Sequence, residues 1–213
     1  MGIARAIEPS GGIFPSVSPD APLTLDELAA GAFRAGNHDS FTEKHGEATP
    51  PAVDLVKGYV NQGFARLCAD RGAAETWLKT RAYPAPLGNV TRDTGTGLKH
   101  RVIQDLRVNG VNSVVRLPER QTLPRPLDHA LDAAALRADV GKNGLVASFV
   151  LDVKDAFMSV PLHPDEMAFN CAELPEDMAL ERRPLDGQEA RKGKFLIWRV
   201  LGFGGRPNPL VFR

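Results

Sequence analysis

The chain has few cysteines and no long hydrophobic run, the features that would indicate a disulfide framework or a membrane anchor. Its 213 residues include two cysteines, Cys68 and Cys171, which are too few for a disulfide framework and lack the spacing of a zinc site. We therefore expect two reduced, partly buried thiols in an intracellular protein, in cytoplasm or nucleus. No apolar run approaches the length of a membrane-spanning helix, so we expect no membrane association. Arg5 is not followed by the hydrophobic segment of a secretory signal.

The sequence also lacks a net charge. Lys plus Arg and Asp plus Glu are 26 each, which gives a formal charge of +0. Any surface that binds nucleic acid must therefore be a local groove, because the protein has no general basic character. Hydrophobic residues make up 43% of the chain, as in a globular protein with a core, and the length suits one large or two small domains.

The first part of the chain predicts helices. Residues 1–22 are rich in Gly, Pro and Ser and suggest a flexible lead-in. Thr24 and Glu27 have the spacing of a capping box, which predicts a helix through about Arg34. A polar loop over residues 36–47 follows, and we expect its two histidines to face solvent, namely His38 and His45.

A stronger helix is predicted to begin at Thr49, with prolines in its first turn. Its C-terminal stop is expected at Gly72, and a short helix over 73–79, anchored by Trp77, is expected to follow. The apolar residues of the longer helix fall on one stripe at helical spacing, namely Val53, Val56, Val60, Phe64 and Leu67.

The middle of the chain predicts a β-hairpin. Residues 87–92 and 98–105 are two extended runs on either side of a loop that contains Gly95. Lys99 and Arg101 are two residues apart, so on a strand both side chains point to the same face. The pair is typical either of a solvated strand face or of a phosphate-binding one.

An apolar run over residues 145–151 predicts a buried strand after a helix over 127–138. Asp152 directly follows this run, and a carboxylate at the end of such a strand can bind a metal ion at the edge of the core. Farther on, residues 167–174 and 194–201 predict a long hairpin around a charged loop. A glycine-rich turn comes next, beginning at Gly202.

The order of these features resembles that of a known family. Residues 99–109, KHRVIQDLRVN, resemble the fingers motif of retroelement reverse transcriptases. Residues 151–162, LDVKDAFMSVPL, resemble the palm motif that holds the first catalytic aspartate, and residues 201–212, LGFGGRPNPLVF, resemble the motif that follows. The resemblance covers about residues 84–213, and three ordered motifs are far more specific than one.

The resemblance implies an α+β fold, the fingers and incomplete palm of a right-hand polymerase, with helices packed on antiparallel strands. The resemblance also divides the chain into parts. The lead-in covers residues 1–22, and the N-terminal helix and loop cover residues 23–48. The remaining parts would be the fingers in two segments, 49–125 and 160–204, and the palm in two segments, 126–159 and 205–213, the second of which starts a palm helix.

The resemblance also implies template-directed DNA synthesis by two-metal nucleotidyl transfer, with an RNA or DNA template, a DNA primer and deoxynucleoside triphosphates as partners. Asp152 matches the aspartate that holds two Mg²⁺ ions, or Mn²⁺ in their place. Val153 matches a position whose backbone carbonyl completes one metal shell. Asp155 and Ala156 match positions whose backbone amides meet the incoming triphosphate.

Further site residues follow from the same resemblance. Arg101 matches the fingers arginine that reaches the triphosphate, and Lys99 lies close to the family's triphosphate lysine. Phe157 matches the steric gate that closes against a ribose 2′-hydroxyl, which implies a preference for deoxynucleotides. Phe203 and Gly204 match positions that line the nucleotide pocket near the sugar and the template base.

The sequence departs from the family at one important point: it contains no aromatic-x-Asp-Asp segment, the source of the remaining metal-binding aspartates. One carboxylate cannot easily hold two divalent cations against their repulsion. We therefore expect this chain alone to be inactive as a polymerase, and a fragment of a longer product with more palm and a thumb. The alternatives are a non-catalytic relic that binds nucleic acid or a partner, and an unrelated phosphotransfer enzyme that uses Asp152 and Asp155.

Overall fold

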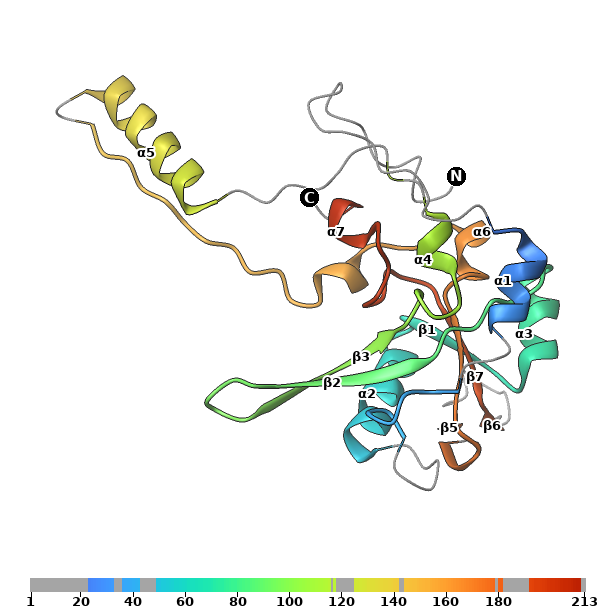
Figure 1. Ribbon diagram of the computed structural model, residues 1–213. Helices are drawn as coiled ribbons and strands as arrows, with labels where there is room; N and C mark the ends of the chain where they lie inside the picture. Colours follow the sequence, from blue (N-terminus) through green and yellow to red (C-terminus); the bar gives the residue numbers. More distant parts are fainter. Residues whose placement is uncertain are drawn as a thin grey trace.

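The structure is a computed structural model (Figure 1), and the fold it shows is mixed α+β, with helices packed on small antiparallel sheets. In the part of the chain that it describes, no helix is long and apolar enough to cross a membrane. The predicted lead-in and His45 lie outside that part. The described residues are 23–32, 36–42, 49–115, 117, 125–141, 144–178, 180–181 and 192–211.

A three-stranded antiparallel sheet lies at the centre of the fold. Strand β7 (Phe195–Trp198) pairs with β1 (Ala65–Cys68) on one side and with β4 (Cys171–Glu173) on the other. All four residues of β7 are buried, as expected for a central strand with both faces covered. The predicted hairpin between residues 167–174 and 194–201 is confirmed by the pairing of β4 with β7.

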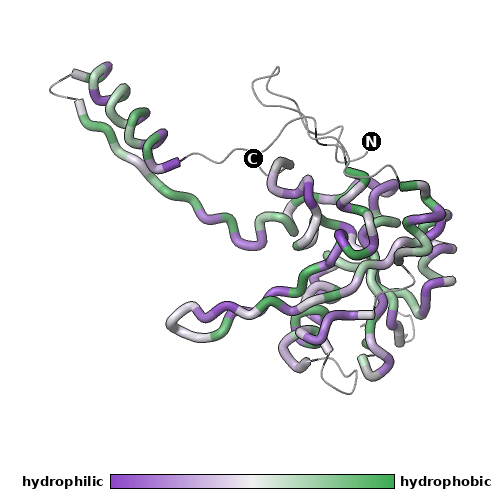
Figure 2. Tube along the Cα trace, in the orientation of Figure 1, coloured by the Kyte–Doolittle hydropathy of each residue, from purple (hydrophilic) through white to green (hydrophobic). Residues whose placement is uncertain are grey.

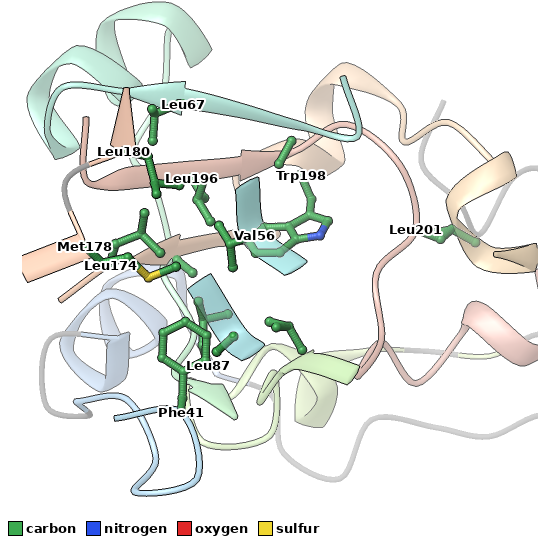
Figure 3. Close-up of a cluster of buried hydrophobic side chains, with 14 of the residues drawn as sticks. Phe41, Val56, Leu67, Leu87, Leu174, Met178, Leu180, Leu196, Trp198 and Leu201 are labelled. Atoms are coloured by element: carbon green, nitrogen blue, oxygen red, sulfur yellow. The ribbon is translucent and has the colours of Figure 1, made fainter. Parts of the chain in front are cut away.

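Two helices cover the two faces of this sheet. Alternate side chains of β7 point to opposite faces, so Leu196 and Trp198 join the main core cluster with α2 (Pro50–Asn61). Phe195 and Ile197 pack with Cys68, Cys171 and α3 (Arg71–Leu78). The two cysteines are buried and form no disulfide with each other. Figure 3 shows the main cluster, whose members include Phe41, Val56, Leu67, Leu87, Leu196, Trp198 and Leu201.

The helix that begins at Pro50 ends earlier than predicted. Gly63, with a φ of +77°, follows the helix, and the chain then enters β1. Phe64 therefore lies outside the helix, and Leu67 belongs to the strand. The prediction was wrong here because the apolar stripe continues across the boundary, whereas the backbone gains hydrogen bonds to β7 that a longer helix would lose.

A long two-stranded ribbon extends from the body of the protein (Figure 1). It consists of β2 (Leu87–Asp93) and β3 (Leu98–Gln104), paired antiparallel as the sequence predicts. The carboxylate of Asp93 accepts from the backbone N–H of Gly95, and the N–H of Thr94 donates to the carbonyl of Gly97. Only the base of the ribbon packs on the core, through Leu87 and Val102.

Shorter elements complete the body. The predicted capping box of Thr24 and Glu27 is confirmed, since the Glu27 N–H donates to the Thr24 hydroxyl at 3.2 Å and the Thr24 N–H to the Glu27 carboxylate at 2.8 Å. The remaining elements are α1 (Leu25–Ala32), α4 (Val111–Val114), the 3-10 helix η2 (Ala156–Ser159), α6 (Pro164–Met167), the 3-10 helix η3 (Glu176–Met178), β5 (Leu180–Glu181), β6 (Lys192–Gly193) and α7 (Asn208–Val211).

Helix α5 (Pro126–Val140) and the extended segment 144–153 project away from the body, and we call them the arm (Figure 1). No residue of α5 is buried. Much of the returning segment is apolar (Figure 2), yet Leu145 is 95% exposed and Leu151 is 78% exposed.

The buried strand predicted over 145–151 is therefore wrong. A strand needs neighbours for its N–H and C=O groups, and none of the described strands pairs with this segment. Its apolar residues are consequently left in solvent. Asp152 does not lie at the edge of the core but in the exposed arm.

Candidate functional site

Three of the predicted site residues meet around one aromatic ring, although they come from different parts of the chain. The guanidinium of Arg101, on β3, lies 5.6 Å from the ring centroid of Phe203. The ring centroid of Phe157, in η2, lies 5.7 Å from that of Phe203, with the ring planes at 68°. Cations over ring faces and edge-to-face ring pairs are both attractive. These contacts join β3, η2 and the turn before α7.

Backbone contacts hold Phe203 beside β3. Its carbonyl accepts from the N–H of Gln104 at 2.8 Å, and Ile103 and Phe203 form a parallel bridge. Gly204 follows with a φ of +122°, and a Cβ there would lie 1.8 Å from the carbonyl oxygen of Gln104. Only glycine permits this approach. Gly204 thus lets the turn dock on β3, while its role beside a template base stays a prediction.

Asn112, which the sequence pattern does not single out, holds the same turn through polar contacts. Its Nδ2 donates to the carbonyl of Gly204 at 2.8 Å, and its Oδ1 accepts from the backbone N–H of Arg206 at 2.9 Å. The Arg206 Nη1 donates to the Asn112 carbonyl at 3.3 Å. Asparagine is common near turns, so nothing local in the sequence marks this one as a clamp.

The strand register gathers three cations on one face of the ribbon. Arg92 lies directly opposite Lys99, and Arg101 lies opposite Val90. All three cationic residues are exposed, and within the described ranges no carboxylate forms an ion pair with any of them. Opposed like charges repel, so this face suits an anion such as a phosphate group. Sequence spacing indicates Lys99 and Arg101, whereas Arg92 joins them only through the register.

Tyr59 of α2 is another site residue that the sequence does not indicate. Burial raises the pKa of its hydroxyl, and the nearby charge of Asp155 raises it further. A hydrogen bond from the Val102 N–H and the charge of Arg101 act in the opposite direction. The groups that act on this pKa belong to β3 and to the turn before η2. A tyrosine within an apolar helical stripe usually is a core residue with a polar tip, which conceals this position from a pattern search.

Asp155 turns the chain from the arm into η2. Its backbone has φ +51° and ψ +40°, a left-handed conformation that aspartate tolerates better than most residues. Ala156 begins η2 directly after this turn, and the next residue, Phe157, reaches the ring of Phe203. The contacts of the Asp155 and Ala156 amides with a triphosphate stay predictions.

The predicted metal ligands, Asp152 and Val153, lie at the end of the arm, where both are exposed. A carboxylate and a backbone carbonyl are oxygen donors of the kind that Mg²⁺ prefers. Within the described part of the chain, however, no cluster of three or more His, Cys, Asp or Glu side chains is placed to hold a metal ion. The donors present fit Mg²⁺ in type but are too few for two ions.

The polar surroundings of His38 in the sequence predict a side chain that faces solvent, but in the structure this side chain also has a partner. Its Nε2 lies 3.0 Å from the Oδ2 of Asp105. The Oδ1 of Asp105 accepts from the backbone N–H groups of Arg107 and Val108 at 3.1 and 3.2 Å. Asp105 therefore ties the segment 36–42 to the end of β3.

The assembled site has a cationic strand on one side and two aromatic rings beside it. Asn112 of α4 holds the turn after Phe203 in place. This arrangement can bind an anionic group next to a flat ring system. No protein-family model matches this chain, and no curated protein matches it in sequence.

Proposed function

We propose that this chain forms the nucleotide-binding part of an RNA-directed DNA polymerase of the reverse-transcriptase type. The observation that carries the proposal is the meeting of Arg101, Phe157 and Phe203. Each residue belongs to a different one of the three motifs that resemble the family. Chance likenesses scattered along a sequence would have no reason to converge in space. The β2–β3 ribbon would then belong to the fingers, and η2 would follow the first palm segment.

In this proposal the ribbon binds the triphosphate of the incoming nucleotide. Arg101 is the nearest of the ribbon's cations to the aromatic pair, and Lys99 and Arg92 continue the same face toward the hairpin tip. Arginine matches phosphate geometry with two parallel hydrogen bonds, and lysine adds a mobile point charge. Together they would offset the negative charge of the triphosphate.

Phe157 would select the sugar. Its ring is held edge-on against Phe203, so it cannot move freely away from a ligand on the other side. A ribose 2′-hydroxyl against this ring would clash or lose its hydrogen-bond partners, whereas a deoxyribose would not. The site would therefore prefer deoxynucleotides, as the resemblance implies.

Nucleotidyl transfer itself needs carboxylates beyond Asp152. We therefore assign to the residues of this chain the binding and orientation of the nucleotide, and no bond-making step. Template and primer would be held mainly through their backbones, with little reading of sequence.

A second candidate is a non-catalytic domain that binds nucleic acid. The directly opposed Arg92 and Lys99 favour it, because a cation pair of this kind suits a phosphate backbone as well as a triphosphate. This domain would bind an RNA–DNA hybrid but would not discriminate dATP from ATP.

Titration calorimetry with dATP in magnesium buffer tests the proposal. Arg101→Ala should weaken dATP binding at least tenfold, because a hydrogen bond to a charged group is lost. Arg137→Ala, on the exposed surface of α5, is the matched control and should bind as the parent protein does. Phe157→Ala should bring the affinity for ATP close to that for dATP. Failure of the parent protein to bind dATP, with retained binding of an RNA–DNA hybrid, would favour the second candidate.

A further inference from the structure

A cavity of about 160 Å³ lies between α4, α6 and the turn that leads into α7, and we call it the α4–α6 cavity. Much of its wall is apolar, formed by Leu106, Val111, Val114, Phe169 and Pro207. A cavity of about 150 Å³ with apolar walls holds one benzene ring. The α4–α6 cavity therefore has the volume for a ligand with a single six-membered ring.

Two asparagines that line the cavity have their amide groups oriented by backbone carbonyls. The Nδ2 of Asn170 donates to the carbonyl of Glu166 at 2.9 Å, and the Nδ2 of Asn208 donates to the carbonyl of Gly202 at 2.5 Å. A carbonyl only accepts hydrogen bonds, so each amide must place its nitrogen at this contact and its oxygen elsewhere. Within the described residues, no donor bonds to the Oδ1 of Asn170 or Asn208. Both oxygens are therefore available to a ligand as acceptors.

Glu166 of α6 is the charged residue among those that line the cavity, and its side chain is partly buried. In the part of the chain that the structure describes, its carboxylate forms no hydrogen bond and no ion pair. A partly buried carboxylate of this kind is best satisfied by a cation that donates N–H hydrogen bonds. Together with the two amide oxygens, Glu166 makes the polar part of the wall a set of acceptors.

We propose that the α4–α6 cavity binds a small organic cation, made of one flat ring and an amidinium or ammonium group. The ring packs among the apolar side chains, and the N–H groups donate to the Glu166 carboxylate and to the amide oxygens of Asn170 and Asn208. A neutral ring compound leaves the carboxylate without a partner, and an anionic one is repelled by it. The inference does not rest on the proposed function, because it assigns no contact with the nucleotide to these residues.

The first test is titration calorimetry with benzamidine, which has one ring and is a cation at neutral pH. The parent protein should bind it with a dissociation constant on the order of 1 mM or tighter, as suits a ligand of this size. Benzyl alcohol has the same ring without the charge and should bind at least about tenfold more weakly. No binding of benzamidine, or equal affinities for the two probes, would overturn the inference.

A pair of variants tests the role of the carboxylate. Glu166→Gln removes the charge at nearly constant size, so it should weaken benzamidine binding about tenfold and leave benzyl alcohol binding unchanged. Asp165→Asn is the matched control, because Asp165 belongs to the same helix but does not line the cavity. This control should bind benzamidine as the parent protein does. Equal losses in the two variants would mean that benzamidine responds only to the overall charge of α6, which contradicts the inference.

A third measurement needs no variant and remains decisive if Glu166→Gln fails to fold. In NMR spectra of the nitrogen-labelled parent protein, saturating benzamidine should shift the side-chain amide signals of Asn170 and Asn208. The amide of Asn37 donates to the carbonyl of Glu173 and does not line the cavity, so its signal should stay in place. Binding of benzamidine without a shift at Asn170 or Asn208 would locate the ligand elsewhere and contradict the inference.

Discussion

The body and the arm each contain an apolar run of similar composition, but the run in the body is buried and the run in the arm is exposed. In the body, the apolar run Phe195–Trp198 forms a central strand whose residues are all buried. In the arm, an apolar run of similar character, 145–151, forms no strand, and Leu151 is 78% exposed. The difference lies in the neighbours, since β7 has β1 and β4 beside it and helices on both faces. Apolar composition alone therefore does not produce a strand.

The same comparison explains where the candidate site is well organised. Arg101 and Phe203 are attached to the body through β3, and the turn is clamped by Asn112. Asp152 belongs to the arm, where it is exposed. The residues that we propose to bind the nucleotide are thus held by tertiary contacts, whereas Asp152, the predicted metal ligand, lies in the exposed arm.

The largest expected effect contrasts a leucine of the body with one of the arm. Leu196→Ala removes a side chain that is 0% exposed in the main core cluster, so we expect it to lower the free energy of unfolding by about 2–5 kcal/mol. Leu151→Ala should change it by less than about 0.5 kcal/mol, because little buried area is lost. Urea denaturation measures both variants. A large loss for Leu151→Ala would show that the arm packs in solution and would break the comparison.

The next largest expected effect compares alanine substitutions at two glycines, one in the turn that docks on β3 and one in the loop of the ribbon. Gly204 and Gly95 both have positive φ, but only Gly204 faces a backbone atom, the carbonyl oxygen of Gln104. Gly95→Ala should cost about 1 kcal/mol of unfolding free energy from backbone strain alone. Gly204→Ala should cost about 3 kcal/mol, since the turn must also leave β3. Equal losses in thermal or urea unfolding would mean that the turn is not docked as described.

The smallest effect concerns a carboxylate of the body at acid pH. The backbone N–H of Ala82 donates to the Oε1 of Glu75 at 3.0 Å, which is the main cause that holds the pKa of Glu75 below its ordinary value of 4.5, opposed by burial and assisted by Arg71. A lowered folded-state pKa contributes stability above pH 4.5 that is lost as pH falls through the folded value.

We therefore expect Glu75→Gln to be less stable than the parent protein at neutral pH, by less than about 1 kcal/mol because of solvent screening. The difference should shrink below pH 4.5. Asp132→Asn, on the exposed surface of α5, should show no such pH-dependent difference. Parallel unfolding curves at pH 7 and pH 3 decide the matter, and a constant difference at both would contradict the assignment.

Local signals predicted local structure well. The capping box of Thr24 and Glu27 and the hairpin around Gly95 are where the sequence places them, because both depend on residues close along the chain. The end of α2 was not predicted because the spacing of apolar residues carries no information on distant strands. It does not indicate that β7 offers backbone hydrogen bonds to the residues of β1. Asn112 was missed because its role depends on contacts to residues far along the chain.

The sequence by itself determined the short-range elements, and it indicated the residues that meet at the site, Arg101, Phe157 and Phe203. Only the tertiary structure decided that these side chains touch and that Arg92 joins the cationic face. It also decided that the run before Asp152 is not a buried strand. The physical reason is that hydrogen bonds within a turn or cap depend on neighbours in sequence. Strand pairing and burial depend on which distant segments are available to cover them.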